Sequence, residues 1–156
     1  EMAALAGMNV TIARPAGYDL DSGVMERVSA ACRASGSRLS VTDDPGSAYA
    51  GQHVVYAKSW GSLQDYGRSP DGDPAFRARW MVTQEKMSRT DEAFFMHCLP
   101  VRRNLVVEDA VLDGPLSAVL DQAENRLHTA KAVLLDLLGS PERRHNEKEA
   151  ACPISS

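Results

Sequence analysis

The sequence lacks the features of a membrane or secreted protein. No apolar run approaches the roughly 18 residues that a membrane helix needs, and the first residues do not combine a basic region with an apolar signal core. Its three cysteines, Cys32, Cys98 and Cys152, lie far apart and form no Cys-x-x-Cys pair. This spacing argues against a zinc ribbon and a disulfide framework, so we expect a cytoplasmic protein in a reducing compartment.

Two further absences exclude classes of function. The formal net charge is -4 and no basic patch is interleaved with aromatic residues, so a nucleic-acid partner is not expected. A Gly-x-Gly-x-x-Gly turn is also missing after the first expected strand, where the chain has only Pro15, Ala16 and Gly17. A dinucleotide-binding domain therefore ranks low among the alternatives.

The residues that are present indicate one α/β domain. The chain has 156 residues, of which 44% are hydrophobic, enough to bury a core without metal or disulfide support. Expected strands alternate with expected helices, which predicts a doubly wound, Rossmann-like parallel sheet with flanking helices. The expected strands are 9–14, 39–41, 54–56, 93–96 and 117–120, and the expected helices are 22–35, 45–49, 75–80, 84–88, 108–112 and 122–138.

The chain divides into a domain and a tail. Residues 1–139 carry the periodic pattern, and 140–156 have none, which predicts a disordered tail. The segment 61–74 is rich in Gly, Ser, Pro and Asp and is a candidate substrate loop. In the last helix, one stripe of residues at helical spacing is expected to face the core; it comprises Ala123, Leu127, Ala130, Leu134 and Leu137.

The motif HCLP at 97–100 follows a strand-length apolar run. Pro100 has no N–H and restricts Leu99, so the carbonyls of Cys98 and Leu99 are available to a ligand NH2 group. Taken alone, each of these residues favours a structural interpretation over a functional one: His97 as a half-buried strand terminus and Cys98 as a small buried hydrophobic residue. Because the carboxyl ends of parallel strands share one crevice, however, Lys58, Cys98, Arg102 and Arg126 are expected to gather around a single hollow at that edge of the sheet.

Three arginines are candidate anion ligands. Arg102 and Arg103 follow the motif and either anchor a carboxylate or are plain surface charges. Arg126 lies near the start of the last helix, where backbone N–H groups favour anions, but it could equally pair with Asp121 and Glu124.

These motifs resemble the aspartate/ornithine carbamoyltransferase family. HCLP is similar to a signature of that family, and the resemblance narrows to the branch acting on N-acylated ornithine through AKSWG at 57–61, VRRN at 101–104 and ENRLH at 124–128. The resemblance implies transfer of a carbamoyl group from carbamoyl phosphate to the side-chain amine of acetylornithine or succinylornithine in arginine biosynthesis. It implies no metal and no organic cofactor.

The resemblance also implies roles for particular residues. Cys98 and Leu99 would hold the carbamoyl group with main-chain oxygens, Leu99–Pro100 would be a cis peptide, and Arg126 would contact carbamoyl phosphate. Lys58 and Arg102 would face the amino-acid substrate. Cys98 and Arg126 are thus the expected catalytic residues, and the expected substrate-binding residues are Lys58, Trp60, His97, Leu99, Pro100 and Arg102.

Two departures from the family pattern limit the prediction. Val106 stands where acetylornithine enzymes carry a lysine, so the sequence does not decide between an acetyl and a succinyl group on the substrate. The phosphate-binding loop of the N-terminal carbamoyl phosphate domain and the first strand of the second domain are absent. We therefore expect a domain truncated at its N-terminal side, the amino-acid-binding half of an enzyme whose intact relatives are homotrimers, and inactive alone. A non-catalytic amino-acid-binding remnant is the main alternative.

Overall fold

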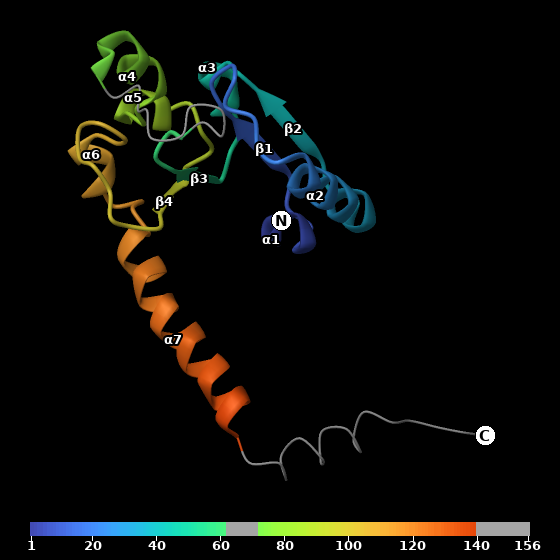
Figure 1. The fold of residues 1–156 in the computed structure, drawn as a ribbon. Helices are drawn as coiled ribbons and strands as arrows, with labels where there is room; N and C mark the ends of the chain where they lie inside the picture. The colour runs from blue at the N-terminus through green and yellow to red at the C-terminus, as the bar shows by residue number, and fades with distance from the viewer. Residues whose placement is uncertain (62–71, 140–156) are drawn as a thin grey trace. The chain divides into compact units, whose positions relative to one another are not determined.

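The computed structural model describes residues 1–61 and 72–139. The predicted substrate loop lies mostly, and the predicted tail entirely, outside these residues. Parallel strands alternate with helices, which confirms the predicted α/β class (Figure 1). The elements are α1 (Met2–Leu5), β1 (Val10–Ala13), α2 (Ser22–Ser35), β2 (Leu39–Thr42), α3 (Pro45–Ala48), β3 (Val54–Ala57), α4 (Pro74–Trp80), α5 (Gln84–Met87), β4 (Phe94–His97), α6 (Asp109–Leu112) and α7 (Val119–Leu138).

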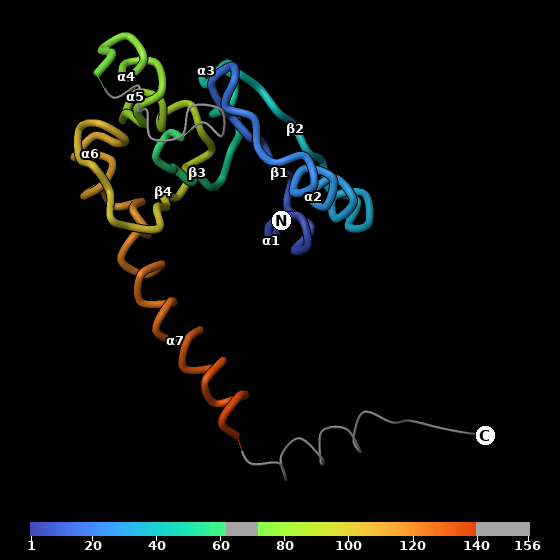
Figure 2. Tube along the Cα trace, viewed as in Figure 1, coloured from blue at the N-terminus to red at the C-terminus, as the bar shows by residue number. Residues whose placement is uncertain are grey.

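The strands form two separate parallel pairs, β1 with β2 and β3 with β4. In the first pair Val10 lies opposite Leu39, and in the second Val54 lies opposite Phe94. Each pair is joined through at least one helix, as parallel strands require, and the trace in Figure 2 follows these crossovers. The predicted parallel arrangement is present, but the described strands do not form one continuous sheet.

Helix α2 covers the β1–β2 pair. Asp21 caps it by accepting a hydrogen bond from the Val24 N–H (3.0 Å), and Gly36 ends it with a φ of 74°, which glycine adopts without steric cost. Its buried residues Val28, Ala31 and Cys32 form a small core with Ala4 of α1.

The β3–β4 pair has a larger core. Phe95 is fully buried, with Val106 and Val107 in the same cluster and residues of α6 beside them. The period-two alternation of β4 turns Phe95 and His97 inward and Phe94 outward, so the exposure of Phe94 is 52% while that of His97 is 1%.

The predicted last strand, 117–120, is wrong in extent. Phe95 donates to the Leu116 carbonyl (2.8 Å) and Ala118 donates to the Phe95 carbonyl (2.9 Å), which makes only an isolated bridge at Ser117. Helix α7 then begins at Val119 instead of residue 122. An acidic residue, Asp121, lies in its first turn, where the helix dipole favours negative charge.

The chain separates into two compact units, Glu1–Val119 and Leu120–Ser156. In the second unit, the predicted core stripe of α7 is exposed: Leu127, Leu134 and Leu137 are 59%, 54% and 62% exposed. The periodicity predicted the helix correctly, but its prediction of burial is wrong within the described residues. None of the described helices combines the length and apolar composition that a membrane span requires.

Candidate functional site

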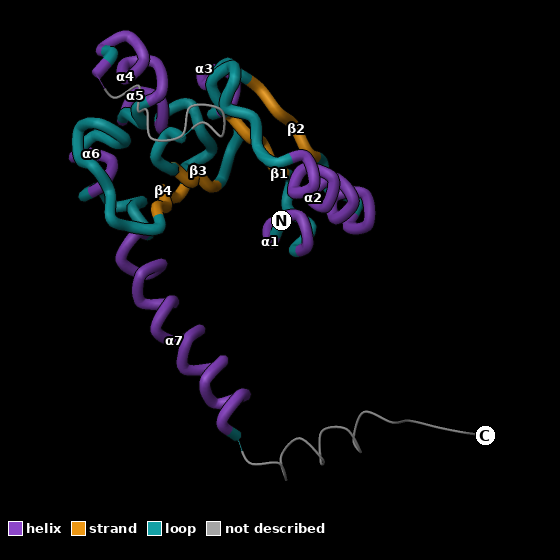
Figure 3. Tube along the Cα trace, in the orientation of Figure 1, coloured by secondary structure: helices purple, strands orange, loops and turns teal. Residues whose placement is uncertain are grey.

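The candidate site is built on the carboxyl ends of β3 and β4. Their register places Ala57 opposite His97, and continuing it by one residue places Lys58 opposite Cys98. Beyond these ends both segments are loops, as the teal trace of Figure 3 shows. The rigid pair of strands thus presents two reactive side chains on adjoining loops, as predicted for a crevice at strand ends.

Lys58 and Cys98 form a direct contact. The Lys58 Nζ donates to the Cys98 Sγ at 3.3 Å. This hydrogen bond lowers the pKa of the Cys98 thiol, with smaller contributions from the Lys58 charge and the Tyr56 hydroxyl. The pair therefore favours a thiolate at a partly exposed position, which is the form of cysteine that reacts and accepts protons.

His97 holds the turn that follows it. The Leu99 N–H donates to the His97 Nδ1 at 2.9 Å, so this nitrogen is unprotonated and the ring is neutral. Burial lowers the pKa of His97, and the nearby Lys58 charge lowers it further. Its buried Nε2 has no hydrogen-bond partner among the described residues. His97 thus supports the turn of the HCLP motif. This agrees closely with the half-buried strand terminus that the sequence predicts for His97 when it is taken alone.

The Leu99–Pro100 peptide is cis, as the resemblance implied, and Leu99 has a φ of 47°. Pro100 is exposed and Leu99 half-buried. Within residues 1–61 and 72–139, no hydrogen bond reaches the Leu99 carbonyl. The turn therefore leaves a main-chain acceptor available to a ligand amide.

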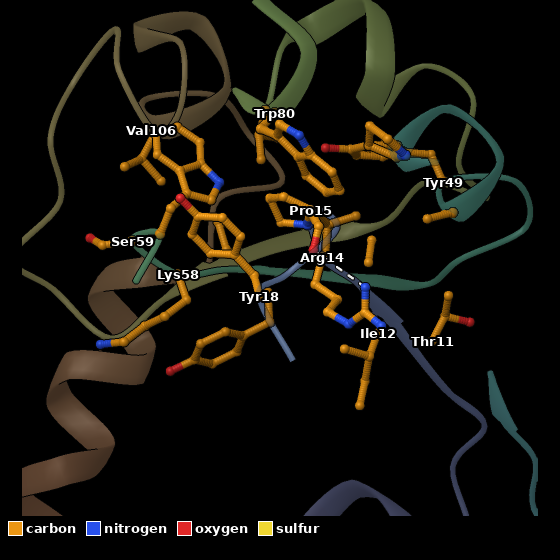
Figure 4. Close-up of a pocket in the computed structure, with 18 of the residues that line it drawn as sticks. Thr11, Ile12, Arg14, Pro15, Tyr18, Tyr49, Lys58, Ser59, Trp80 and Val106 are labelled. Atoms are coloured by element: carbon orange, nitrogen blue, oxygen red, sulfur yellow. Dashed lines mark hydrogen bonds between the residues drawn. The ribbon is translucent and has the colours of Figure 1, made fainter. Parts of the chain in front are cut away.

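A cavity of about 340 Å³ lies beside this site. Residues at and beyond the carboxyl ends of β1 and β3 line it, among them Arg14, Tyr18 and Lys58 (Figure 4). Trp60 lines it as well. Trp60 is held by an edge-to-face contact with Phe76 of α4, with ring centroids 5.2 Å apart. The sequence did not single out Tyr18 or Tyr56. Alternation along β3 could have found Tyr56, because it shares a face with Lys58.

The two arginines after the motif differ in their surroundings. Arg103 binds Asp113 through two hydrogen bonds (2.6 and 2.7 Å) and Asp109 through one (2.7 Å), and these contacts lower the pKa of both carboxyls. Arg103 is therefore held in a local network of ion pairs with Asp109 and Asp113. Arg102 is exposed, and its carbonyl accepts the Val106 N–H at 3.0 Å.

Val106 and Arg126 complete the predicted set. Val106 is 1% exposed, belongs to the core and also lines the cavity. Arg126 is an exposed residue of α7 and belongs to the second unit. The structure therefore brings together Lys58, Cys98, His97 and Leu99 in the first unit, whereas Arg126 belongs to the second unit.

A parallel α/β unit with a cis-proline turn and a lysine at its strand ends fits the class that the HCLP motif resembles, the amino-acid-binding domain of the carbamoyltransferases. Residues 1–137 match the family described as Aspartate/ornithine carbamoyltransferase, Asp/Orn binding domain. The chain belongs to this family.

Curated relatives and solved structures agree with this assignment. The N-acetylornithine carbamoyltransferase of Xanthomonas campestris pv. campestris is 43% identical in an alignment of 136 residues that covers 85% of this chain and 40% of that protein. The ornithine carbamoyltransferase of Acidothermus cellulolyticus is 40% identical, over 86% of this chain and 43% of that protein. A crystal structure of acetylornithine transcarbamylase complexed with acetylcitrulline superposes with a TM-score of 0.81 at 41% identity, covering 89% of this chain and 42% of that one. The chain thus spans about 40% of the length of these relatives.

Proposed function

We propose that this chain is the amino-acid-binding half of an N-acylornithine carbamoyltransferase. The complete enzyme transfers the carbamoyl group of carbamoyl phosphate to the side-chain amine of acetylornithine or succinylornithine. The remaining part of the enzyme supplies the carbamoyl phosphate domain, and the active assembly is a homotrimer. Alone, the chain does not turn over.

One observation carries this proposal: the Lys58–Cys98 pair beside the Leu99–Pro100 turn. Main-chain oxygens of Cys98 and Leu99 hold the carbamoyl NH2, while Arg126 holds the phosphate. The neutral amine attacks the carbamoyl carbon, the new C–N bond forms, the C–O bond to phosphate breaks, and the phosphate leaves with its electron pair. The lowered pKa of Cys98 suits the thiolate to accept the proton that the amine loses.

Charge supports an acylated substrate. Acylation removes the charge of the α-ammonium group. The site therefore needs a cation to bind the substrate carboxylate, but no acidic residue to bind the α-nitrogen. Lys58 and Arg102 supply such cations, and Trp60 and Pro100 provide apolar contact beside them. Positioning of the two substrates and electrostatic stabilisation of the tetrahedral intermediate then account for most of the catalysis.

Reconstitution tests the proposal. The chain is mixed with the part of the Xanthomonas campestris enzyme that lies outside the matched region, and citrulline-type product is measured with carbamoyl phosphate and ornithine, acetylornithine or succinylornithine. We expect product only from the mixture and only with an acylated substrate. The Lys58→Met variant should raise KM for that substrate, whereas Arg33→Met on α2 should not. Product from the isolated chain, or a preference for free ornithine, would contradict the proposal.

A non-catalytic amino-acid-binding role is the second candidate, and the match of residues 1–137 to a family described as an Asp/Orn binding domain is compatible with it. Calorimetry of the isolated chain with acetylornithine and, separately, with carbamoyl phosphate distinguishes the two. Tight binding of the amino acid without any reconstituted activity supports this role over the half-enzyme.

A further inference from the structure

Cys98 has an amine at the place where redox-responsive cysteines often have a second thiol. Such cysteines are accessible thiolates next to a resolving cysteine. Cys98 is partly exposed, and its pKa is lowered, chiefly by the hydrogen bond from Lys58. The group beside its Sγ is the Lys58 Nζ, at 3.3 Å. Cys98 is thus suited to react with an oxidant, with a lysine in the position of the resolving group.

The described part of the chain offers no accessible thiol that could resolve an oxidised Cys98. Cys32 is the other cysteine within residues 1–61 and 72–139, and it is 3% exposed in the small core of α1 and α2. A cysteine packed in this way is inert. A disulfide between these two residues is therefore not the expected fate of an oxidised Cys98.

The strands hold the lysine and the cysteine next to each other. Ala57 lies opposite His97 in the parallel register of β3 and β4, so Lys58 and Cys98 follow on adjoining segments. Lys58 is exposed, and the four-carbon stem of a lysine is flexible. Rotation of this stem can therefore bring the amine from 3.3 Å to bonding distance of the sulfur while the two strands stay in place.

We propose that Lys58 and Cys98 form a reversible sulfur–nitrogen cross-link, a sulfenamide, when hydrogen peroxide reaches the site. The Cys98 thiolate attacks one peroxide oxygen, the O–O bond breaks and hydroxide leaves, so the sulfur is oxidised to sulfenic acid while the peroxide is reduced. The hydroxide takes a proton from the Lys58 ammonium. The neutral amine then attacks the sulfur, the S–O bond breaks, and the departing oxygen takes the amine proton and leaves as water. Sulfenic acids condense with backbone nitrogen in the same way.

Proximity favours the cross-link over further oxidation. A sulfenic acid that meets more peroxide becomes a sulfinic acid, which ordinary thiols do not reduce. An amine held beside the sulfur reacts instead as an intramolecular partner at a high effective concentration. A small thiol reverses the cross-link: it attacks the Cys98 sulfur, the S–N bond breaks and the amine takes a proton. A second thiol then releases the Cys98 thiol as a small disulfide forms.

The cross-link would engage both reactive groups of the candidate site. In the proposed function the Cys98 thiolate accepts a proton and the Lys58 cation binds the substrate carboxylate. Oxidation would therefore switch off both roles until a thiol restores them. Only this consequence rests on the proposed function, whereas the cross-link itself rests on the contact between the two side chains.

Peptide mass spectrometry of the full 156-residue chain tests the proposal. The reduced protein is treated with hydrogen peroxide, quenched, and digested with or without prior dithiothreitol. We expect a species that is lighter than the reduced protein by a pair of hydrogen atoms. Its fragments should join the peptide of Lys58 to the peptide of Cys98, and dithiothreitol should remove it.

A matched variant separates the amine from its charge. Lys58→Arg keeps a positive donor next to the sulfur, but a guanidinium stays protonated and does not act as a nucleophile. Cys98 should therefore still be oxidised and stop at sulfenic acid. Since the intramolecular partner is gone, we expect the dimedone adduct of Cys98 to increase about tenfold over the wild type. Lys131→Arg, the same substitution on α7, should leave the yield of cross-link unchanged.

Three outcomes would overturn the proposal: a disulfide that joins Cys98 to Cys32 or Cys152, equal dimedone adducts in the wild type and Lys58→Arg, or oxidation of wild-type Cys98 to sulfinic acid without a cross-link. The peptide map of the wild type stands without the variants, so a variant that fails to fold does not decide the question. None of these readouts uses carbamoyl transfer, so the cross-link can fail while the proposed function holds.

Discussion

The two strand pairs differ in where their buried residues lie. In the β3–β4 pair the strands themselves contribute buried residues, Ala57, Phe95 and His97, to or beside the larger core. In the β1–β2 pair the strand residues are half-buried or exposed, and the fully buried ones lie in α1 and α2. The reactive Lys58–Cys98 contact belongs to the pair with the buried strands.

This difference indicates how the site is held. A turn that positions a binding group needs supporting residues whose own rotamers are fixed by packing. Phe95 and His97 provide such support, because both are buried, Leu99 packs against the core that contains Phe95, and the His97 Nδ1 accepts the Leu99 N–H. The β1–β2 pair contributes residues that line the cavity, such as Thr11 and Arg14, so disturbing it should affect the Lys58–Cys98 contact less.

The largest effect is expected in the β3–β4 core. Phe95→Ala removes a fully buried ring, so it should lower the free energy of unfolding by about 3–5 kcal/mol. Leu39→Ala in β2, where the side chain is half-buried, is the matched change and should cost clearly less. Urea denaturation with linear extrapolation measures both. Equal losses would remove the contrast between the pairs.

The second prediction concerns the Lys58–Cys98 contact. Replacing Lys58 with Met removes the hydrogen bond that lowers the pKa of Cys98, so this pKa should rise towards its ordinary value. Alkylation of Cys98 by iodoacetamide at pH 7 should slow several-fold, because each pKa unit changes the thiolate fraction about tenfold.

Peptide mass spectrometry follows Cys98 separately from the buried Cys32 over a pH series. The Arg33→Met variant removes a positive charge from α2 and serves as the control. An unchanged pH midpoint in the Lys58 variant would show that the contact does not set the reactivity of Cys98.

A smaller effect is expected at the start of α2. Asp21→Ala removes the cap that accepts the Val24 N–H, which should cost about 1 kcal/mol. Glu26→Ala, an exposed change within the same helix, should cost little. Thermal unfolding followed by circular dichroism compares the two, and a larger loss from Glu26→Ala would argue against the capping role.

The smallest effect is expected at Arg103. Its contacts lower the pKa of Asp109 and Asp113, so they stabilise the fold above the ordinary aspartate pKa of about 3.9 and this contribution is lost as the pH falls through the lowered values. Arg103→Met should reduce Tm slightly at pH 7 and not at all in strong acid. Exposed ion pairs contribute little, which limits the size of the change. A Tm difference that grows on acidification would have the wrong sign.

Local sequence signals predicted most of the elements. Asp21 and Gly36 mark the ends of α2, and the apolar residues of β4 mark the strand before the HCLP motif, because caps and periodicity depend only on neighbouring residues. The same signals predicted too long a strand at residues 117–120, because the structure has only an isolated bridge at Ser117 and α7 begins at Val119.

The burial of α7 illustrates the opposite case. Its apolar stripe predicted a helix with a covered face, yet Leu127 and Leu134 are exposed. Periodicity states which side of a helix is apolar, whereas burial depends on what other polypeptide lies against it.

By itself, the sequence determined the α/β class, the position of the HCLP turn at a strand end and the family to which the chain belongs. Only the tertiary structure decided that Lys58 contacts Cys98, that Arg103 pairs with Asp109 and Asp113, and that residues of β1 and β3 line one cavity. The reason is physical: capping and alternation act over a few residues. Strand register and ion pairing, in contrast, join groups that are distant in the chain and form only when it folds.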